Sequence, residues 1–532
     1  MFDGKPDPAS GLAHIAADTS YPLLDQTIGE CLRDKVARFG ERDALIWREG
    51  EDLRRFTYAQ LLDKAELVAS WLLERAAPGD RIAIWSRNSA EWVLVEYACA
   101  LAGMVVAGFN PAWSQRECEH ARDLTEPAVL LAGFDTRGVS LMERAHELMP
   151  ADKVFALEDL FSLIEGTRRV AMPEVAQDDL FLIQFTSGTT GRSKGAALTH
   201  FQALNAGYLR SVAAAMDETD VWLNGAPLNH VGGALSVVLG SVTMGSCYVL
   251  MNRFDATEYL KLMRETGASR IGGVPTMLIA LCEHPDWRPQ DFHIRSIGSG
   301  GAAVPKPLIE RLNREFGAPV LVVFGQSESV MITSSVPSDP PEVAAETSGR
   351  AAPHVELKIA DVATGETVKI GEVGEICARS PMVMTGYFRQ PEATAKTIDA
   401  DGFLHTGDLG SLDADGYLRI HGRTREVIIR GGENIYPAEI EDHLLEHPDI
   451  VSLAVVGVPD ERWGQTVACA VKLRDGASFD AQAMEAFAAE GLAHFKVPRT
   501  WLALDSFPLT ASGKIRKVEV EKMFEPNPAA AG

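Results

Sequence analysis

Apolar and polar positions alternate along most of the chain with two different periods. Residues 58–76, YAQLLDKAELVASWLLERA, place apolar side chains at helical spacing, and the short apolar run RIAIW follows a Pro-Gly-Asp turn. Similar short runs, closed by Gly or Pro, recur at VWLNGAPL, SCYVLM, SRIGGVP and VLVVFG. Helices that alternate with short strands predict an α/β protein with largely parallel sheets.

The pattern changes near residue 422. The segment 415–448, DGYLRIHGRTREVIIRGGENIYPAEIEDHLLEHP, predicts a turn, a strand, a polar Gly-Arg junction, a second strand and a helix after Pro437. The strand patterns VSLAVVGVP and TVACAVKLRDG and the helical pattern AQAMEAFAAE follow. We therefore expect a large N-terminal domain, residues 1–424, and a small α+β C-terminal domain, residues 425–532.

Composition narrows the class of protein. The chain has 532 residues, which is long for one core, and it is 46% hydrophobic and 23% charged, as ordinary globular proteins are. Its net charge of −24 disfavours nucleic acid and anionic lipid as partners, and its apolar runs are too short to span a bilayer. Seven scattered cysteines and an N-terminus without a secretory pattern predict free thiols in a cytoplasmic protein with no stable membrane insertion.

Residues 185–195, FTSGTTGRSKG, follow the apolar run LFLIQF and combine three glycines, five hydroxyl side chains and one lysine. Glycine lets backbone N–H groups wrap an anion, and hydroxyl and ammonium groups add donors. The loop is not a Walker A loop, because two residues separate Gly191 from Lys194. Composition alone is equally compatible with a phosphate-binding loop and with an ordinary surface loop.

The ordered string TSGTTGxxKG resembles the phosphate loop of the adenylate-forming superfamily, which contains acyl-CoA synthetases, adenylation domains of peptide synthetases and luciferases. This chain has SKG where the family has PKG. Further segments resemble the family's later motifs and occur in the family's order: FGQSES at 324–329, TGD at 406–408, GRTRE at 422–426, GGENIYPAEIE at 431–441 and LTASGKIRK at 509–517. The resemblance covers residues 25 to 520 and is strongest to the acyl- and aryl-CoA synthetase branch, in particular to medium-chain acyl-CoA synthetases.

The resemblance implies a fold and a reaction. Layered α/β subdomains and a β-rich subdomain form the large domain, and the small domain is a mobile lid. The reaction is ATP-dependent carboxylate–CoA ligation: an acid becomes acyl-AMP with release of pyrophosphate, and the acyl group then passes to CoA. ATP, Mg²⁺ and CoA are the implied cofactor and co-substrates, and fatty acid metabolism is the implied setting.

The resemblance also assigns residues. Lys514, Glu328 and His230 are the catalytic candidates; Lys514 stabilises charge during adenylation, and Glu328 holds Mg²⁺ together with the ATP phosphates. The candidates for binding ATP or AMP are Thr186, Ser187, Gly188, Thr189, Thr190, Gly191, Lys194, Gly300, Gly301, Ala302, Gly325, Gln326, Ser327, Asp408 and Arg423. Asp408 and Arg423 correspond to the family's ribose-binding pair.

The remaining candidates concern the lid and the acid. Arg425 is at the hinge position, and the CoA-binding candidates are Gly431, Gly432, Phe495 and Arg499. The acyl-pocket candidates are His230, Val231, Gly233 and Met331. Small residues after His230 suggest room for a medium-chain or ring-bearing acid. None of these candidates is a cation that would pair with a charge on the substrate, so we expect an apolar monocarboxylic acid, fatty or aromatic.

Other interpretations are open at this stage. A free-standing enzyme could pass the acyl group to a carrier protein or an amine instead of CoA. The segment GSGGAA, 298–303, also forms G-x-G-x-x-A, a weak indication of a dinucleotide-binding oxidoreductase that leaves the other motifs unexplained. A non-catalytic nucleotide-binding regulator would not need Lys514. A homodimer is compatible with the sequence.

Overall fold

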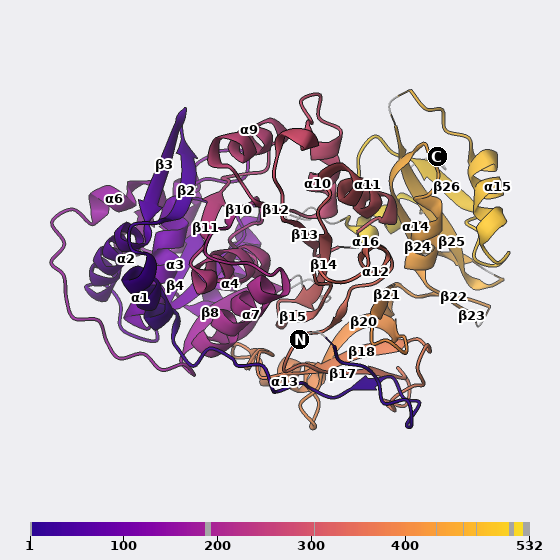
Figure 1. Ribbon diagram of the computed structural model, residues 1–532, viewed down its shortest axis with the longest axis horizontal. Helices are drawn as coiled ribbons and strands as arrows, with labels where there is room; N and C mark the ends of the chain where they lie inside the picture. The colour runs from indigo at the N-terminus through magenta and orange to yellow at the C-terminus, as the bar shows by residue number, and fades with distance from the viewer. Residues whose placement is uncertain are drawn as a thin grey trace.

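The computed structural model describes residues 3–186, 193–302, 304–431, 433–460, 462–474, 476–509 and 515–524. Two adjoining α/β layers, a β-rich unit below them and a smaller C-terminal unit make up the described chain (Figure 1). The mixed α/β class with a large N-terminal region and a small C-terminal domain is confirmed.

The first layer is built on a seven-stranded sheet that is parallel in its centre. Its strands, in spatial order, are β19 (Gly386–Tyr387), β9 (Lys194–Thr199), β8 (Leu180–Thr186), β5 (Val105–Phe109), β4 (Arg81–Trp85), β6 (Val129–Ala132) and β7 (Val154–Ala156). The helices of this part of the chain are α1 (Ile28–Phe39), α2 (Tyr58–Leu73), α3 (Ala90–Ala102), α4 (Gln115–Thr125), α5 (Met142–Leu148), α6 (Leu160–Leu163) and the short 3-10 turns η1 (Ala151–Lys153) and η2 (Leu157–Asp159).

The second layer is built on a nine-stranded sheet whose neighbours β2, β11, β10, β12, β13 and β14 are parallel. Its order is β16 (Arg350–Ala351), β15 (Ser329–Ser334), β14 (Val320–Gln326), β13 (Ser296–Gly300), β12 (Arg270–Gly272), β10 (Val221–Asn224), β11 (Cys247–Leu250), β2 (Asp43–Glu49) and β3 (Asp52–Thr57). Its helices are α7 (His200–Ala213), the π-helix η3 (Gly232–Leu239), α8 (Gly240–Met244), α9 (Ala256–Thr266), α10 (Pro275–Cys282), the 3-10 turn η4 (Pro289–Asp291), α11 (Lys306–Phe316) and α12 (Pro341–Glu346).

Alternate residues of the second sheet contribute to two separate cores. Trp222, Tyr248 and Leu321 pack in one cluster with residues of α7 and η3. Leu223 and Ile271 pack in another with residues of α9, α10, α11 and α12. Both faces are covered, which explains why these strands read as nearly continuous apolar runs in the sequence.

The β-rich unit is an antiparallel sheet with α13 (Pro391–Thr397) beside it in the chain. Its order is β1 (His14–Ile15), β17 (Glu356–Ala360), β18 (Gly374–Arg379), β20 (Leu404–Leu412) and β21 (Leu418–Arg423). The C-terminal unit follows the 3-10 turn η5 (Thr424–Glu426) and contains β22 (Ile428–Arg430), β23 (Glu433–Ile435), β24 (Ile450–Asp460), β25 (Gly464–Leu473), β26 (Thr500–Ala503), α14 (Pro437–Leu444), α15 (Ala481–Gly491) and α16 (Lys517–Met523).

Local sequence explains where the main helices begin. Thr57 and Thr199 cap α2 and α7. Each hydroxyl accepts a hydrogen bond from the backbone amide three residues on, and the side chain of the glutamine at that position accepts one from the backbone amide of the threonine. The predicted helix near residues 58–76 is α2, and the predicted helix after Pro437 is α14.

All seven cysteines are free and buried. Within the described ranges, no helix is both long enough and apolar enough to cross a bilayer.

Candidate active site

The base of the predicted phosphate loop is a strand pair. Thr186 ends β8 and is the register partner of Lys194, the first residue of β9. The ladder behind them is buried, so the two ends of the loop are held at a fixed separation. The predicted residues Ser187, Gly188, Thr189, Thr190 and Gly191 lie outside the described residues.

A tyrosine links this loop to the predicted metal-binding carboxylate. The Lys194 ammonium lies 4.5 Å from the centre of the Tyr387 ring, and the Tyr387 hydroxyl donates a 2.5 Å hydrogen bond to Glu328 Oε1. Burial, reinforced by the Glu328 charge, raises the pKa of Tyr387, so its hydroxyl stays a donor. Residues from three distant segments therefore meet at one place. Tyr387 was missed by the sequence analysis; its only signal was the aromatic pair in TGYF, 385–388.

Glu328 lies in the tight connection between β14 and β15. A side chain at Gly325 would place its Cβ 2.2 Å from the Val330 carbonyl oxygen, so only glycine permits this turn. Ser327 and Glu328 are 8% and 7% exposed. Gln326 ends β14, and its buried Nε2 has no hydrogen-bond acceptor in the described part of the chain.

The predicted adenine-side segment ends β13. A Cβ at Gly300 would lie 2.6 Å from the Val323 carbonyl oxygen, so this strand end also requires glycine. Gly301 has a φ of +76° and, like Ala302, is exposed. This backbone is therefore open to a flat ligand.

Asp408 and Arg423 are paired across β20 and β21. They are register partners, and Arg423 Nε lies 2.9 Å from Asp408 Oδ1. Asp408 is 6% exposed, whereas the Arg423 side chain is 39% exposed. The structure thus brings together the two residues that the resemblance assigned to the ribose.

A polar cluster supports the loop before Asp408. Glu375 Oε1 accepts a 2.9 Å hydrogen bond from the Gly407 amide, and its Oε2 lies 2.8 Å from His405 Nδ1. Cys377 Sγ is 3.6 Å from the same imidazole nitrogen. Three metal-ligand residue types therefore converge from β18 and β20, which the spacing of cysteines and histidines in the sequence did not reveal. Their existing bonds orient the Asp408 loop.

His230 lies two residues before the first residue of the π-helix η3. Its Nδ1 accepts a 3.1 Å hydrogen bond from the Gly232 amide. A π-helix is rare and is often found at functional sites. Gly233 is buried, and a Cβ there would lie 2.2 Å from the Pro227 carbonyl oxygen, so its missing side chain accommodates the backbone of Pro227.

Val231 and Met331, the other acyl-pocket candidates, are 3% and 2% exposed. Met331 packs in a cluster with Leu209 of α7. Both side chains are walls of a packed region rather than surface residues.

The residues predicted to form the hinge and the lid lie in or next to the C-terminal unit. Arg425 is exposed in η5. Lys517 of α16 lies 2.7 Å from Glu441 and 3.4 Å from Glu426, so it connects the lid to the residue after Arg425. Burial by itself lowers the pKa of Lys517, but the two carboxylates raise it above its ordinary value. The predicted catalytic residue Lys514 lies outside the described residues.

The CoA-binding candidates are spread over the same unit. Gly431 has a φ of +62°, and a Cβ there would lie 2.8 Å from the ring of the half-exposed Trp463. Phe495 packs on the lid core, and Arg499 pairs with Glu485. Gly432 lies outside the described residues.

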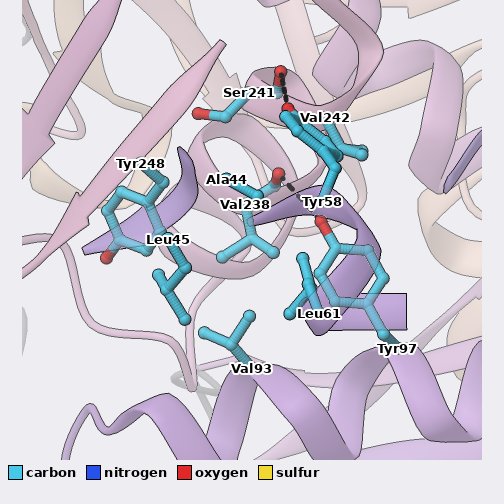
Figure 2. A pocket seen from close by; sticks show the side chains of 10 residues that line it. All are labelled: Ala44, Leu45, Tyr58, Leu61, Val93, Tyr97, Val238, Ser241, Val242 and Tyr248. Atoms are coloured by element: carbon cyan, nitrogen blue, oxygen red, sulfur yellow. Dashed lines mark hydrogen bonds between the residues drawn. The ribbon is translucent and has the colours of Figure 1, made fainter. Parts of the chain in front are cut away.

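A small internal cavity lies away from these residues. Figure 2 shows its lining, where the Tyr58 and Tyr97 hydroxyls donate to the Ser241 and Val238 carbonyl oxygens. Its volume of about 10 Å³ holds at most one water molecule. It contains none of the predicted site residues, and we regard it as a packing defect beside η3.

Comparisons with known proteins agree with this geometry. Residues 32–388 match the family model described as AMP-binding enzyme, and residues 439–514 match the AMP-binding enzyme C-terminal domain. The chain is 33% identical to the acyl-CoA synthetase YngI of Bacillus subtilis, over 94% of this chain and 98% of YngI. It is also 33% identical to the mitochondrial medium-chain acyl-CoA ligase ACSF2 of Rattus norvegicus, over 98% of this chain and 91% of that protein. The crystal structure of ATP-bound MatB from Rhodopseudomonas palustris superposes with a TM-score of 0.86 at 28% identity, covering 94% of this chain and 99% of MatB.

Proposed function

The chain belongs to the AMP-binding enzyme family, in its acyl-CoA synthetase branch, and we propose how its residues carry out ATP-dependent ligation of an acid to CoA. The observation that carries the proposal is the convergence of Lys194, Tyr387 and Glu328 from three distant segments. A phosphate loop, an ammonium group and a carboxylate at one place suit a metal-bound polyphosphate.

The first half-reaction removes the charge of the substrate carboxylate. A carboxylate oxygen attacks the α-phosphorus of ATP, the bond to pyrophosphate breaks, and acyl-AMP forms. We assign the nucleotide sugar to Asp408, which accepts hydrogen bonds from its hydroxyls while Arg423 holds the carboxylate in place. Glu375 fixes the Gly407 amide and so positions Asp408. The enzyme's contribution is alignment and charge stabilisation.

Glu328 fits a role in holding Mg²⁺. Among the described residues, Tyr387 alone hydrogen-bonds to its carboxylate, through Oε1, which leaves Oε2 for a cation. Mg²⁺ prefers carboxylate and phosphate oxygens, and when bound it neutralises phosphate charge. Tyr387 then orients Glu328, and Lys194 adds positive charge beside the same phosphates.

The second half-reaction requires the lid to move. We propose that Lys514 contacts the reacting groups during adenylation and that rotation at Arg425 then withdraws it. The CoA thiolate would reach the acyl-AMP along Gly431 and Gly432, attack the acyl carbon and expel AMP. We place the lid at residues 425–532 and the main body at 1–424; the polar junction η5, with Arg425 exposed, supports this boundary.

For the acid, we propose a mainly apolar carboxylic acid of medium chain length or with a ring. Buried Val231 and Met331 near the π-helix support an apolar wall. CoA is the proposed acceptor; transfer to a carrier protein or an amine is the alternative. A cytoplasmic location and a homodimer stay predictions.

The two half-reactions can be separated experimentally. Purified protein should exchange labelled pyrophosphate into ATP only when a suitable acid is present, and should form a thioester when CoA is added. Lys514→Ala should lose adenylation by about 100-fold or more, yet convert supplied acyl-AMP to the thioester at the normal rate. Arg425→Pro is the matched variant and should show the opposite pattern. Equal loss of both half-reactions in Lys514→Ala would refute the two-conformation mechanism, and no exchange with any acid would refute the ligase.

A further inference from the structure

Arg210 is a buried arginine in the middle of the large domain. It lies on α7 and is 6% exposed. Its guanidinium carbon is 5.8 Å from the centre of the Trp222 ring, and a Cβ at Gly298 would lie 2.6 Å from its Nη2. The guanidinium therefore occupies the space in which a side chain at Gly298 would stand.

No carboxylate pairs with Arg210 in the described part of the chain. Its buried Nη1 has no acceptor within the described ranges. Burial, with a smaller contribution from the charge of Arg270, lowers the pKa of Arg210 to about 10, so it stays protonated at neutral pH. A contact with an aromatic ring at this distance does not offset the loss of hydration of a buried cation. A retained, unpaired buried cation needs another explanation.

Arg270, on the same face of the sheet, is a buried arginine whose charge is compensated by protein groups. Its Nε lies 2.8 Å from the buried carboxylate of Asp220. Its other nitrogens donate to the Ala214 and Ala215 carbonyl oxygens and to Ser296 Oγ at 2.6–2.7 Å. Within the described ranges, Arg270 thus has a carboxylate counter-ion and three neutral acceptors, whereas Nη1 of Arg210 has no acceptor.

The sheet beneath Arg210 provides a second donor, because two glycines leave room for the polar ends of longer side chains. Asn224, Gly272 and Gly298 are register partners on β10, β12 and β13, so their side-chain positions point to the same face. A Cβ at Gly272 would lie 2.5 Å from Asn224 Nδ2, as one at Gly298 would lie beside Arg210. The Asn224 Oδ1 accepts from the Ala226 amide, which fixes the amide orientation and leaves Nδ2 as a donor toward the glycines.

This face adjoins the proposed acid-binding region. One turn before Arg210, Gly207 allows α7 to contact η3, because a Cβ there would lie 2.6 Å from the Leu235 carbonyl oxygen. Leu209 packs with Met331. Gly298 and, on η3, Gly232 and Ser236 are partly exposed although the surrounding strands and helices are buried. This face is therefore not fully closed to solvent beside Arg210.

We propose that Arg210, with Asn224, is a specificity-determining site at the inner end of the acid-binding region, and that it recognises a hydrogen-bond-accepting oxygen carried by the acid. The preferred substrate then has an apolar body with a reactive carboxylate at one end and a ketone carbonyl or second carboxylate at the other. The guanidinium and the amide supply converging donors to that oxygen. This inference rests on the proposed ligase activity and makes its substrate class more specific.

The test compares acids that differ only at the far end. Octanoic acid, its methyl-ketone analogue of equal length and octanedioic acid are assayed by acid-dependent pyrophosphate exchange, and the set is repeated with longer and shorter chains. The proteins are wild type, Arg210→Met, which keeps the length without the charge, and Arg210→Lys, which keeps the charge with fewer donors. Tyr208→Phe, on the same helix, is the control for disturbance of α7.

At the best chain length, wild type should favour an oxygen-bearing acid over the methyl-ended acid by about tenfold or more in kcat/KM. Arg210→Met should abolish or reverse this ratio mainly through KM while methyl-ended acids keep their activity. Arg210→Lys should retain part of it, more for the dicarboxylate than for the ketone. Tyr208→Phe should match wild type.

Two results would overturn the inference while leaving the ligase intact: preference for methyl-ended acids at every length, or an equal loss for all acids in Arg210→Met. The second result would assign Arg210 to the reactive carboxylate or to folding, which circular dichroism of the variant distinguishes. Absence of exchange with every acid in wild type would overturn the ligase and this inference together.

Discussion

In the half of the site proposed for the nucleotide, buried charged groups already have protein partners: Asp408 pairs with Arg423, and Glu328 accepts a hydrogen bond from Tyr387. In the half proposed for the acid, Nη1 of the buried Arg210 has no hydrogen-bond acceptor among the described residues, and its Nη2 lies where a side chain at Gly298 would stand. ATP brings its own charge and cation, so its ligands can be preorganised by the protein. Arg210 instead keeps a hydrogen-bond donor without an acceptor among the described residues, and an oxygen of a suitable acid can accept from it.

Three buried basic residues on or near α7 differ in how their positive charge is compensated or removed. Arg270 is compensated by Asp220. His200, the first residue of α7, is fully buried against Phe181, and burial lowers its pKa to about 4, so it loses its proton. Arg210 has no carboxylate beside it among the described residues. It also cannot lose its proton, because arginine does not deprotonate at neutral pH. The comparison separates residues that serve folding from one that reduces stability.

The two arginines should differ most in what their replacement does to the free energy of unfolding. Arg270→Met should lower the free energy of unfolding by about 3–5 kcal/mol, because it leaves the Asp220 carboxylate buried with only partial compensation. Arg210→Met should leave it unchanged or raise it, because the variant removes an uncompensated charge. Urea denaturation of both variants and wild type measures this difference.

A destabilisation of Arg210→Met as large as that of Arg270→Met would show that Arg210 serves folding. Arg295→Met is a useful intermediate control, because Arg295 also pairs with Asp220 but its side chain is 44% exposed.

The next effect concerns the nucleotide half. Asp408→Ala should lower kcat/KM for ATP by about 100-fold, because it removes the two charge-assisted hydrogen bonds proposed to the ribose and the carboxylate that faces Arg423. The ratio of activities between oxygen-bearing and methyl-ended acids should not change. Steady-state kinetics with ATP varied, then with acid varied, separates the two halves.

Asp413→Ala, in the turn that connects the same two strands, is the matched control and should keep normal ATP kinetics. If Asp408→Ala altered acid selectivity as strongly as ATP use, the two halves would not be independent.

The smallest effect is on pH dependence. His200 has a folded-state pKa of about 4, below its unfolded value of about 6.5, so the unfolded state binds a proton first as pH falls. Its contribution to stability is complete above about pH 6.5 and should decline by about 2 kcal/mol at pH 5. In His200→Phe the free energy of unfolding should fall less between neutral pH and pH 5. Equal slopes for variant and wild type in urea titrations would show that His200 does not titrate in this way.

Much of the fold was predictable because the signals were local. The helical spacing and the Thr57 cap predicted α2, and Pro437 marked the first residue of α14. Short apolar runs predicted the strands of the two large sheets, since strands covered on both faces must be apolar throughout. The π-helix η3 was not predictable, because its apolar sequence GGALSVVL fits any buried helix.

Site residues could be proposed from the sequence where they belong to contiguous motifs, as with the Asp408 and Glu328 segments. Tyr387 and Glu375 were missed because each acts through a residue far away in the sequence. Gly233 was expected to leave room for the acid, but its space accommodates the Pro227 backbone. We expected no cation to pair with a charge on the acid because only residues in contiguous motifs were candidates, and Arg210 lies outside those motifs.

The sequence was enough to predict the fold class and the family and to propose the nucleotide-binding motifs, because these depend on periodicity and on residues close together in the chain. Tertiary structure alone decided which buried charges are compensated. Whether Arg210 or Arg270 faces a carboxylate depends on strand register and on how α7 lies across the sheet, and neither is encoded in the residues around either arginine.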